Sequence, residues 1–404
     1  MLDINTIRKD FPILDEKVNG QKLIYFDNAA TSQTPNQVVN SIVDYYQRTN
    51  SNIHRGNHKL SIQATTAYED VREKLQKYFN SRLPQEIIFT SGTTQSINII
   101  TLGYTDILTS QDEVIVSEME HHSNIVPIQM LCERTGAKLN VIPMDNQGNL
   151  IMKEFDKFLS EKTKLVFVSH VSNALGTVNP ISYIIDKSHG VGAKVLIDGA
   201  QGASHFEIDF QKLDIDYYTV SAHKMCGPTG VGILYGKEEL LNKLSPWHGG
   251  GEMIDEVSFE KTTYGELPHK FEPGTPNIAG VIAFGAAIEY MDKIGLDNIQ
   301  AHEDELLKYC TQELKKIKGL KIYGEAKNKI AVISFNVEGI HHYDLGSLLD
   351  QFGVAVRIGH HCAQPVMNYF KIPGTVRISF SFYNTKEEID LMIKALNRAI
   401  MMLQ

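Results

Sequence analysis

The feature that most constrains the fold is an alternation of short apolar runs with helical segments from residue 22 to about residue 236. The runs are rich in Val, Ile, Phe and Tyr and cover 22–26, 86–90, 113–117, 164–170, 194–198, 217–222 and 230–235. Several lack polar alternation, which indicates strands buried on both faces. Between two of them, apolar residues recur at helical spacing from Leu60 to Phe79. This alternation predicts an α/β fold with a large, mostly parallel seven-stranded sheet covered by helices on both sides.

The pattern changes near residue 295, where a charged helical segment begins. Apolar runs follow at 329–337, 353–358 and 374–380, and an amphipathic helix then presents Ile389, Met392, Leu396, Ala399 and Leu403 on one stripe. These segments predict a smaller α+β domain. A chain of 404 residues is long enough for two cores. We expect an N-terminal segment at 1–20 that packs with the small domain, a large domain at 21–294 and the small domain at 295–404.

The composition of the chain disfavours some classes of binding partner and some cellular locations. The formal charge is -9, and no run of Lys and Arg interrupts this balance, which disfavours nucleic acid and membrane surfaces. The N-terminus lacks an apolar signal core, and no apolar run approaches a bilayer-spanning length. The four cysteines are widely separated, unlike a disulfide framework. We therefore expect a soluble, cytoplasmic protein with mostly free thiols.

Polar side chains follow several of the runs, at the carboxyl ends where such a sheet binds ligands. They are Gly92, Thr93 and Thr94, then His121 and His122, then Asn173, then Asp198 to Gln201, and finally His223 and Lys224. Taken singly, such a threonine is usually a helix cap, an acid is a cap or surface group, and a lysine is solvated. Together they supply an anion site, a flat ring, a carboxylate and an amine, which are the groups that pyridoxal phosphate (PLP) needs. The glycines of GVGAKVLIDGAQ precede their strand and so do not match a dinucleotide-binding turn.

Five segments then carry a resemblance to a known family, namely MEHHSN, DGAQ, SAHKMCGPTG, FEPGTPN and RIGHHCAQP. From YFDNAAT at 25–31 to the terminal helix, the chain resembles the SufS-like group of cysteine desulfurases, which belong to the class-V aminotransferase family and to PLP fold-type I. The resemblance implies a homodimer that converts L-cysteine to L-alanine and delivers the sulfur for iron–sulfur cluster assembly. It also implies an acceptor protein of the SufU or SufE type.

The same resemblance implies a role for each matching residue. Lys224 would bond to the cofactor aldehyde and later move the substrate proton, Asp198 would hold the proton on the ring nitrogen, and His121 would stack on the ring. The other cofactor contacts implied are Gln201 at the ring hydroxyl, Thr93, Ser221 and His223 at the phosphate, and Thr275 from a second subunit. The substrate contacts implied are Asn173, Arg377, Arg357, His54 and Arg55. Two positions depart from the group, Ala222 in place of glycine and Cys226 in place of a larger residue, and we expect only small packing changes from them.

The stretch RIGHHCAQP raises the question of what Cys362 does. A zinc site made of His360, His361 and Cys362 is disfavoured because three adjacent residues rarely converge on one tetrahedral ion, so we expect no metal site. A buried, inert thiol is the commonest fate of a cysteine but does not suit so polar a stretch. The remaining interpretation is a nucleophile that becomes a persulfide, with nearby positive groups stabilising the thiolate. The short segment resembles that of the SufS-like branch, which favours a dedicated acceptor.

Other functions remain open from the sequence. One is a selenocysteine lyase, an aminotransferase or another class-V PLP enzyme, which would keep Lys224 and Asp198 but would need Cys362 less. Another is a cofactor-free binding protein that carries sulfur on a cysteine, which would be colourless. His341 and His342 are core or surface histidines, and we expect one of them to be a candidate contact for the acceptor.

Overall fold

The main sheet contains seven strands in the computed structural model, which describes residues 2–404. In spatial order they are β4 (Ile87–Thr90), β10 (Gly232–Gly236), β9 (Tyr217–Ser221), β8 (Lys194–Asp198), β7 (Thr163–Ser169), β5 (Glu113–Ser117) and β6 (Lys138–Ile142). All run parallel to one another except β10, which is antiparallel to both of its neighbours. The expected fold class and strand number are therefore confirmed.

One of the seven predicted strands was assigned to the wrong sheet. The run at 22–26 does not join the main sheet, because β3 (Ile24–Tyr25) pairs in parallel with β15 (Val354–Ala355). The seventh strand of the main sheet is β6, which the sequence analysis missed. β6 lies at the sheet edge and alternates exposed and buried residues, so it lacks the continuous apolar run that marked the central strands.

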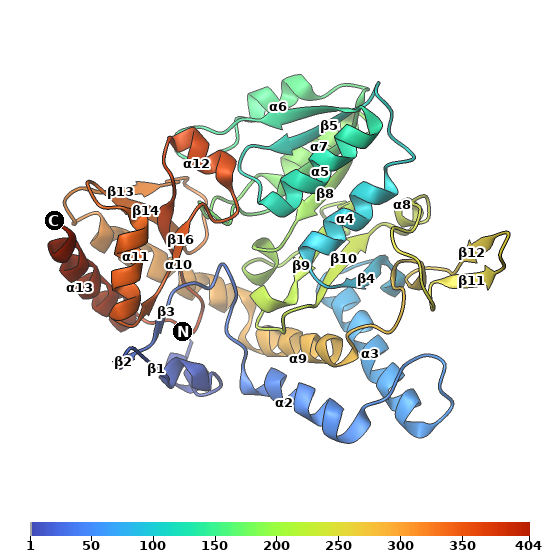
Figure 1. Cartoon of the computed structure of the whole chain (residues 1–404), viewed down its shortest axis with the longest axis horizontal. Coiled ribbons are helices and arrows are strands. Elements are labelled where there is room, and N and C mark those ends of the chain that lie inside the picture. Colours follow the sequence, from blue (N-terminus) through green and yellow to red (C-terminus); the bar gives the residue numbers. More distant parts are fainter. Residues whose placement is uncertain (1) are drawn as a thin grey trace.

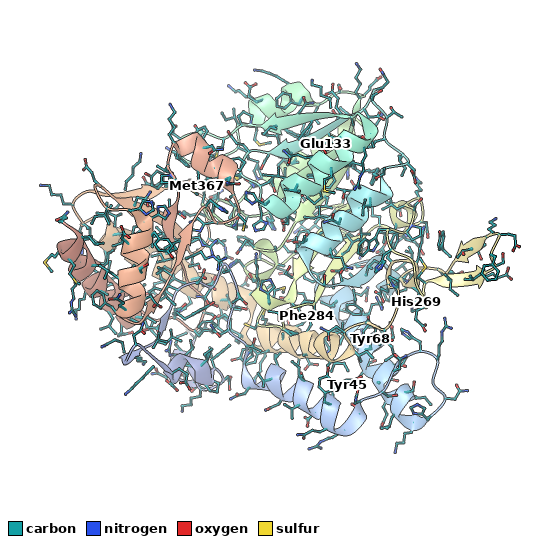
Figure 2. The ribbon with its side chains drawn as sticks, in the orientation of Figure 1. Tyr45, Tyr68, Glu133, His269, Phe284 and Met367 are labelled. Atoms are coloured by element: carbon teal, nitrogen blue, oxygen red, sulfur yellow. The ribbon has the colours of Figure 1, made fainter. Side chains whose placement is uncertain are left out.

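Consecutive strand residues face two separate cores, as a doubly covered sheet requires. In β8, for example, Val195 and Ile197 belong to one buried cluster and Leu196 to the other. The first cluster is covered by α2 (Asn36–Asp44), α3 (Lys59–Tyr78), α6 (Met152–Phe158), α7 (Ile181–Gly190) and α9 (Ile278–Ile294). The second is covered by α4 (Thr93–Gly103), α5 (His122–Thr135) and α8 (Glu238–Leu241). Figure 2 labels Tyr45, Tyr68 and Phe284, which all lie in the first cluster.

A smaller body stands beside the main sheet (Figure 1). Its antiparallel sheet has the order β13 (Leu320–Tyr323), β14 (Val332–Val337), β17 (Thr375–Ser379) and β16 (Arg357–Gly359). The helices of this part are α10 (Leu296–Leu314), α11 (His342–Gln351), α12 (Gln364–Phe370) and α13 (Lys386–Leu403). In α13, Ile389, Met392 and Leu396 are buried in the core of the smaller body, on the apolar stripe that the sequence predicted.

The N-terminal segment also contacts the smaller body. Arg8 at the end of α1 (Ile4–Arg8) forms an ion pair with Glu388 of α13 at 2.9 Å. After the short hairpin of β1 (Lys17–Val18) and β2 (Gln21–Lys22), Ile24 and Phe26 are buried in the same core as α13. The N-terminal contribution to this core therefore comes from residues after position 20, whereas Phe11 and Leu14 are buried in the first cluster.

A second hairpin, β11 (Ile254–Val257) with β12 (Thr262–Tyr264), extends away from the rest of the molecule (Figure 1). Its side chains Val257, Phe259 and Tyr264 are exposed although they are large and apolar. No helix within residues 2–404 combines the length and apolar character needed to cross a lipid bilayer.

Candidate functional site

A cavity of about 400 Å³ opens at the carboxyl ends of the main strands and is closed on its far side by the smaller body. This volume suits a small organic molecule, for which protein pockets measure about 300–1,000 Å³. Most of the predicted site residues line it, namely Thr93, His121, Asn173, Asp198, Gln201, Ser221, His223, Lys224, Arg357, Cys362 and Arg377. Segments nearly 300 residues apart in sequence thus meet at one site.

Lys224 supplies the amine of this site. It ends the single helical turn Ala222–Lys224, which follows β9 directly, so its position is fixed by a fully buried strand. Burial disfavours the charged ammonium and lowers the pKa of Lys224 to about 8, although Asp198 opposes this shift. A lysine with such a pKa is partly a free amine near neutral pH, which both imine formation and proton transfer require.

Asp198 ends β8 and is buried beside this lysine. Its Oδ1 accepts the backbone N–H of Ala200 at 2.9 Å. Burial raises the pKa of Asp198, and Lys224 counteracts part of that effect. A buried carboxylate of this kind is stabilised by a cationic partner, such as a protonated ring nitrogen.

His121 and Gln201 add a flat ring and an amide to the same wall. The Nδ1 atom of His121 accepts the backbone N–H of Ser123 at 3.0 Å, which caps α5 and fixes the ring. Burial lowers the pKa of His121 to about 3, so the ring is neutral and can stack on another ring. Gln201 is buried and donates its amide N–H to the carbonyl of Ala29 at 2.6 Å.

An anion site lies where α4 begins. Gly92 precedes the helix with a φ of 137°, a conformation that favours glycine. The backbone N–H of Thr93 donates to Ser221 Oγ at 3.0 Å, and the Ser221 hydroxyl is 3.0 Å from Thr93 Oγ1. The N-terminus of an eleven-residue helix with two hydroxyls is a suitable phosphate site. His223 lies nearby with its pKa lowered to about 4 by burial and by Lys224.

These groups fit PLP as a set. The wall offers an amine, a buried carboxylate, a neutral ring, an amide and a helix N-terminus with hydroxyls, all on one cavity. PLP carries an aldehyde for the amine, a ring nitrogen for the carboxylate, a ring hydroxyl for the amide and a phosphate for the helix N-terminus, and the neutral ring suits its aromatic face.

The opposite wall carries the positive charge of the site. Arg377 in β17 is buried; its Nη1 donates to the carbonyl of Asn173 at 2.9 Å and its Nη2 pairs with Asp27 at 3.1 Å. Its Nε is buried without a hydrogen-bond partner. Half-exposed Arg357 reaches the other oxygen of Asp27 at 3.5 Å. Two guanidinium groups facing the cavity, one with an unused donor, suit a substrate carboxylate.

Cys362 lies on a short turn between β16 and α12. Gly359, His361 and Cys362 all have positive φ, so the turn is sharply bent. Two hydrogen bonds dock it on the large body, from Asn173 Nδ2 to the His361 carbonyl and from the His122 N–H to the Cys362 carbonyl, each 2.7 Å long. The Cys362 side chain is half-buried and lines the same cavity as Lys224.

Three predicted residues lie outside this cavity. His54 is bound to Glu69 at 2.9 Å, and Arg55 forms an ion pair with Glu252 at 2.8 Å. Thr275 is exposed in the segment between the projecting hairpin and α9. Of the two histidines proposed for an acceptor contact, His341 is exposed and His342 is buried.

Sequence reasoning missed two acids, one that lines the cavity and one that is buried next to a residue of the site. Asp27 follows the run at 22–26 and bridges both arginines, but the run was assigned to the wrong sheet. Glu120 precedes the predicted histidines and is fully enclosed; it accepts from Asn124 at 2.7 Å and from the backbone of Ser169 at 2.9 Å. Burial raises its pKa to about 7. An acid directly after an apolar run was a usable signal for Asp27, whereas no local pattern marks Glu120.

The two departures from the family pattern have clear surroundings. Ala222 is completely buried, and its carbonyl accepts the backbone N–H of Gly227 at 2.9 Å. Cys226 is also buried, and its N–H donates to Ser32 Oγ at 2.8 Å. Burial raises the pKa of the Cys226 thiol to about 12. This thiol is therefore a poor nucleophile.

Comparisons with known proteins agree with this geometry. The family model described as aminotransferase class-V matches residues 24–392. A probable cysteine desulfurase of Synechocystis is 49% identical over 98% of this chain and 95% of its own length, and a cysteine desulfurase of Escherichia coli is 46% identical over 98% of both chains. Among solved structures, a cysteine desulfurase from Thermococcus onnurineus superimposes with a TM-score of 0.94 at 38% identity, covering 100% of this chain and 99% of the other.

Proposed function

Because this chain belongs to the class-V aminotransferase family and, within it, to the PLP-dependent cysteine desulfurases, we propose that Cys362 takes the sulfur of L-cysteine and leaves L-alanine. The observation that carries this proposal is the single cavity lined by Lys224, Asp198 and Cys362. An amine, a buried carboxylate and a thiol on one cavity supply the groups that the reaction uses. The sulfur is then available for iron–sulfur cluster assembly.

The large body holds the cofactor and moves the substrate proton. When bound, PLP supplies an electron sink that acidifies the α-C–H of the substrate and weakens its bond to sulfur. Lys224 Nζ accepts the α-proton, because its pKa of about 8 leaves an amine available near neutral pH. Asp198 would hold the proton on the ring nitrogen. His121 is neutral because burial lowers its pKa to about 3, and it would support the ring without adding a positive charge.

The smaller body supplies Arg377 and Cys362, and together with Asn173 of the large body it positions the substrate and accepts the sulfur. Arg377 and Asn173 bind the substrate carboxylate. The Arg377 guanidinium is held in place by the carbonyl of Asn173 and by the carboxylate of Asp27. The Cys362 thiolate attacks the substrate sulfur, so that an S–S bond forms as the Cβ–S bond breaks. The electron pair stays on the carbon, which takes up a proton and leaves as alanine. The persulfide remains on Cys362 without any external oxidant.

The other cysteines are poorly suited to this step. Burial raises the pKa of the thiol to about 11 in Cys132 and to about 12 in Cys226, and it also raises the pKa of Cys310. These thiols stay protonated at neutral pH, and a thiol is a weak nucleophile. We therefore expect Cys362 alone to carry sulfur.

The test is a single turnover of the coloured holoenzyme with L-cysteine. We expect one extra sulfur atom on the peptide that contains Cys362 and one equivalent of alanine. Sulfur on another cysteine, or alanine formed with free sulfide and no labelled protein, would favour a lyase-type enzyme instead. A colourless protein with no absorbance from a lysine imine would contradict the PLP assignment.

We also propose the SufS-like branch, with an acceptor protein of the SufU or SufE type. The turn that carries Cys362 is short and held by two hydrogen bonds to the large body, so the persulfide cannot travel far. The acceptor must then bring its own nucleophile to the cavity mouth. Exposed His341 is the proposed contact, because His342 is buried. His341→Ala should slow persulfide transfer to the acceptor but not alanine formation under single-turnover conditions.

A homodimer and a cytoplasmic location complete the proposal. Exposed Thr275 and the projecting hairpin, with its exposed Phe259, support a second copy covering this face. His54 and Arg55 lie outside the cavity of their own chain, which is consistent with a role at the subunit boundary. Light scattering should give a molar mass of twice that of one chain. Phe259→Asp should lower this mass toward that of a single chain. The four free cysteines suit a reducing compartment.

A further inference from the structure

Three side chains that can bind a metal meet beside the cavity, and one of them, Cys362, also lines it. The donor atoms of His122, His360 and Cys362 all lie within 4.8 Å of one another. His122 begins α5 on the large body, whereas the other two residues belong to the turn after β16. The sequence argument against a metal considered adjacent residues only. The structure turns His361 away, toward Thr375 Oγ1 at 2.7 Å, and brings in His122 from the opposite wall.

We propose that these three side chains bind one Zn²⁺ ion, and that the bound ion blocks desulfuration by capturing the Cys362 sulfur. Two imidazoles and one thiolate are a common donor set for zinc, with the fourth position left to water. His360 is exposed, and His122 and Cys362 are half-buried, so the ion can enter from solvent. Binding forms a Zn–S bond and releases the thiol proton, with no change of oxidation state.

The geometry needs only a small contraction. In a tetrahedral zinc site, a ligating nitrogen and sulfur stand roughly 3.6 Å apart, which follows from bond lengths of about 2.1 and 2.3 Å. The present limit of 4.8 Å therefore requires each nitrogen–sulfur pair to close by roughly 1.2 Å at most. The rings of His122 and His360 already face each other, with centroids 5.5 Å apart. The turn that carries two of the ligands can supply this movement, because His360 has an exposed side chain.

Metal binding would also rearrange the turn. His122 Nε2 accepts the Gln364 N–H and His360 Nδ1 accepts the Cys362 N–H, each at 3.1 Å. A neutral imidazole has one lone pair on nitrogen, so a metal must displace both hydrogen bonds. A zinc–thiolate site outweighs two such bonds. Arg357 and Arg377 oppose a dication nearby, but both face Asp27, which offsets part of their charge.

The test uses the holoenzyme without substrate and Co²⁺ as a spectroscopic probe of the zinc site. We expect one Co²⁺ per subunit, a thiolate-to-cobalt charge-transfer band, and displacement of Co²⁺ by Zn²⁺. Cys362→Ala should abolish the band. His122→Ala and His360→Ala should each weaken Zn²⁺ binding at least about tenfold, measured against a competing chelator. Cys132→Ala and His248→Ala are matched controls, a half-buried thiol and an exposed histidine, and should bind the ion as wild type does.

Two outcomes would overturn the proposal. One is the absence of a charge-transfer band in wild type. The other is Zn²⁺ affinity that is lost in Cys362→Ala but unchanged in both histidine variants, which would indicate a lone thiolate. If His122→Ala fails to retain its cofactor colour, His360→Ala alone decides, because the His360 side chain is exposed and we expect its removal to leave the fold intact. In wild type, Zn²⁺ should also stop alanine formation, and a chelator should restore it.

Discussion

The two walls of the cavity are built in different ways. The large-body wall holds buried Asp198 and Ser221 at the ends of buried strands, and half-buried Lys224 one short turn beyond them. The small-body wall presents Cys362 on a bent turn with a half-buried side chain. A cofactor is best held by a rigid, dry wall, where electrostatic effects are strong. A sulfur carrier must instead be reached by a second protein. We therefore expect that substitutions can remove cofactor binding by one wall and sulfur transfer by the other independently.

The largest expected effect is at Lys224. Lys224→Ala removes both the cofactor bond and the proton acceptor, so kcat/KM for L-cysteine should fall by about 10⁴-fold or more. The visible band of the lysine imine should disappear as well. Lys329→Met is a matched control, because Lys329 is also a half-buried lysine whose pKa is lowered to about 8, yet it lies outside the cavity. The control should keep its colour and activity. A Lys224→Ala protein that retains the imine band would refute the assignment.

Cys362→Ala should separate the two walls. Without the thiolate, alanine formation should fall by about 10³-fold or more, while the imine band stays unchanged because the large-body wall is intact. Cys132→Ala serves as the thiol control and should retain full activity. Normal turnover by Cys362→Ala would mean that the walls do not divide the chemistry in this way, and it would favour a lyase that needs no persulfide.

The sequence predicted the large-body wall better than the small-body wall. Asp198 and Lys224 follow continuous apolar runs, and parallel strands bring their carboxyl ends to one edge, so local patterns were sufficient. The role of Arg377 came from family resemblance, and that of Cys362 from the resemblance together with the polar stretch around it. Cys362 and Arg377 lie near Lys224 because of the way the two bodies pack together, and no local sequence pattern predicts that packing. His122 was noted only as a residue after a strand, and its approach to Cys362 was not predicted.

The errors in the fold have the same physical origin. The run at 22–26 reads like a core strand because Phe26 and its neighbours are buried, but they are buried against the smaller body. Strand β6 was missed because an edge strand exposes every second side chain. A hydrophobic pattern indicates that a segment is buried, but it does not indicate in which core the segment packs. Asp27 was missed for this reason, since the run that precedes it was placed in the wrong sheet.

Asp27 allows a test of how the arginines depend on their partner. Asp27→Asn leaves the buried charge of Arg377 without its carboxylate, which should lower the free energy of unfolding by about 3 kcal/mol. Added L-alanine should stabilise the variant more than wild type, because a product carboxylate replaces the missing charge. Urea denaturation with and without alanine measures both effects. Asp44→Asn, which breaks the exposed pair with Arg48, should change little. If both variants lost the same free energy of unfolding, the buried ion pair of Asp27 with Arg377 would be no more stabilising than the exposed one.

The smallest effect at neutral pH concerns His170 at the end of β7, behind the large-body wall. Burial lowers its pKa to about 4, and its ring is 3.1 Å from the Tyr218 hydroxyl. Above the unfolded-state pKa of about 6.5, neither state is protonated and the histidine adds no pH dependence. Between about pH 6.5 and 4 only the unfolded state takes up the proton, so acid should destabilise the cofactor-free protein. His170→Gln should reduce this slope by at most about 1.4 kcal/mol per pH unit. His248→Gln, on an exposed histidine, should leave the slope unchanged. An unaltered slope in His170→Gln would mean that this wall admits water, and the contrast between a dry wall and an accessible one would then fail.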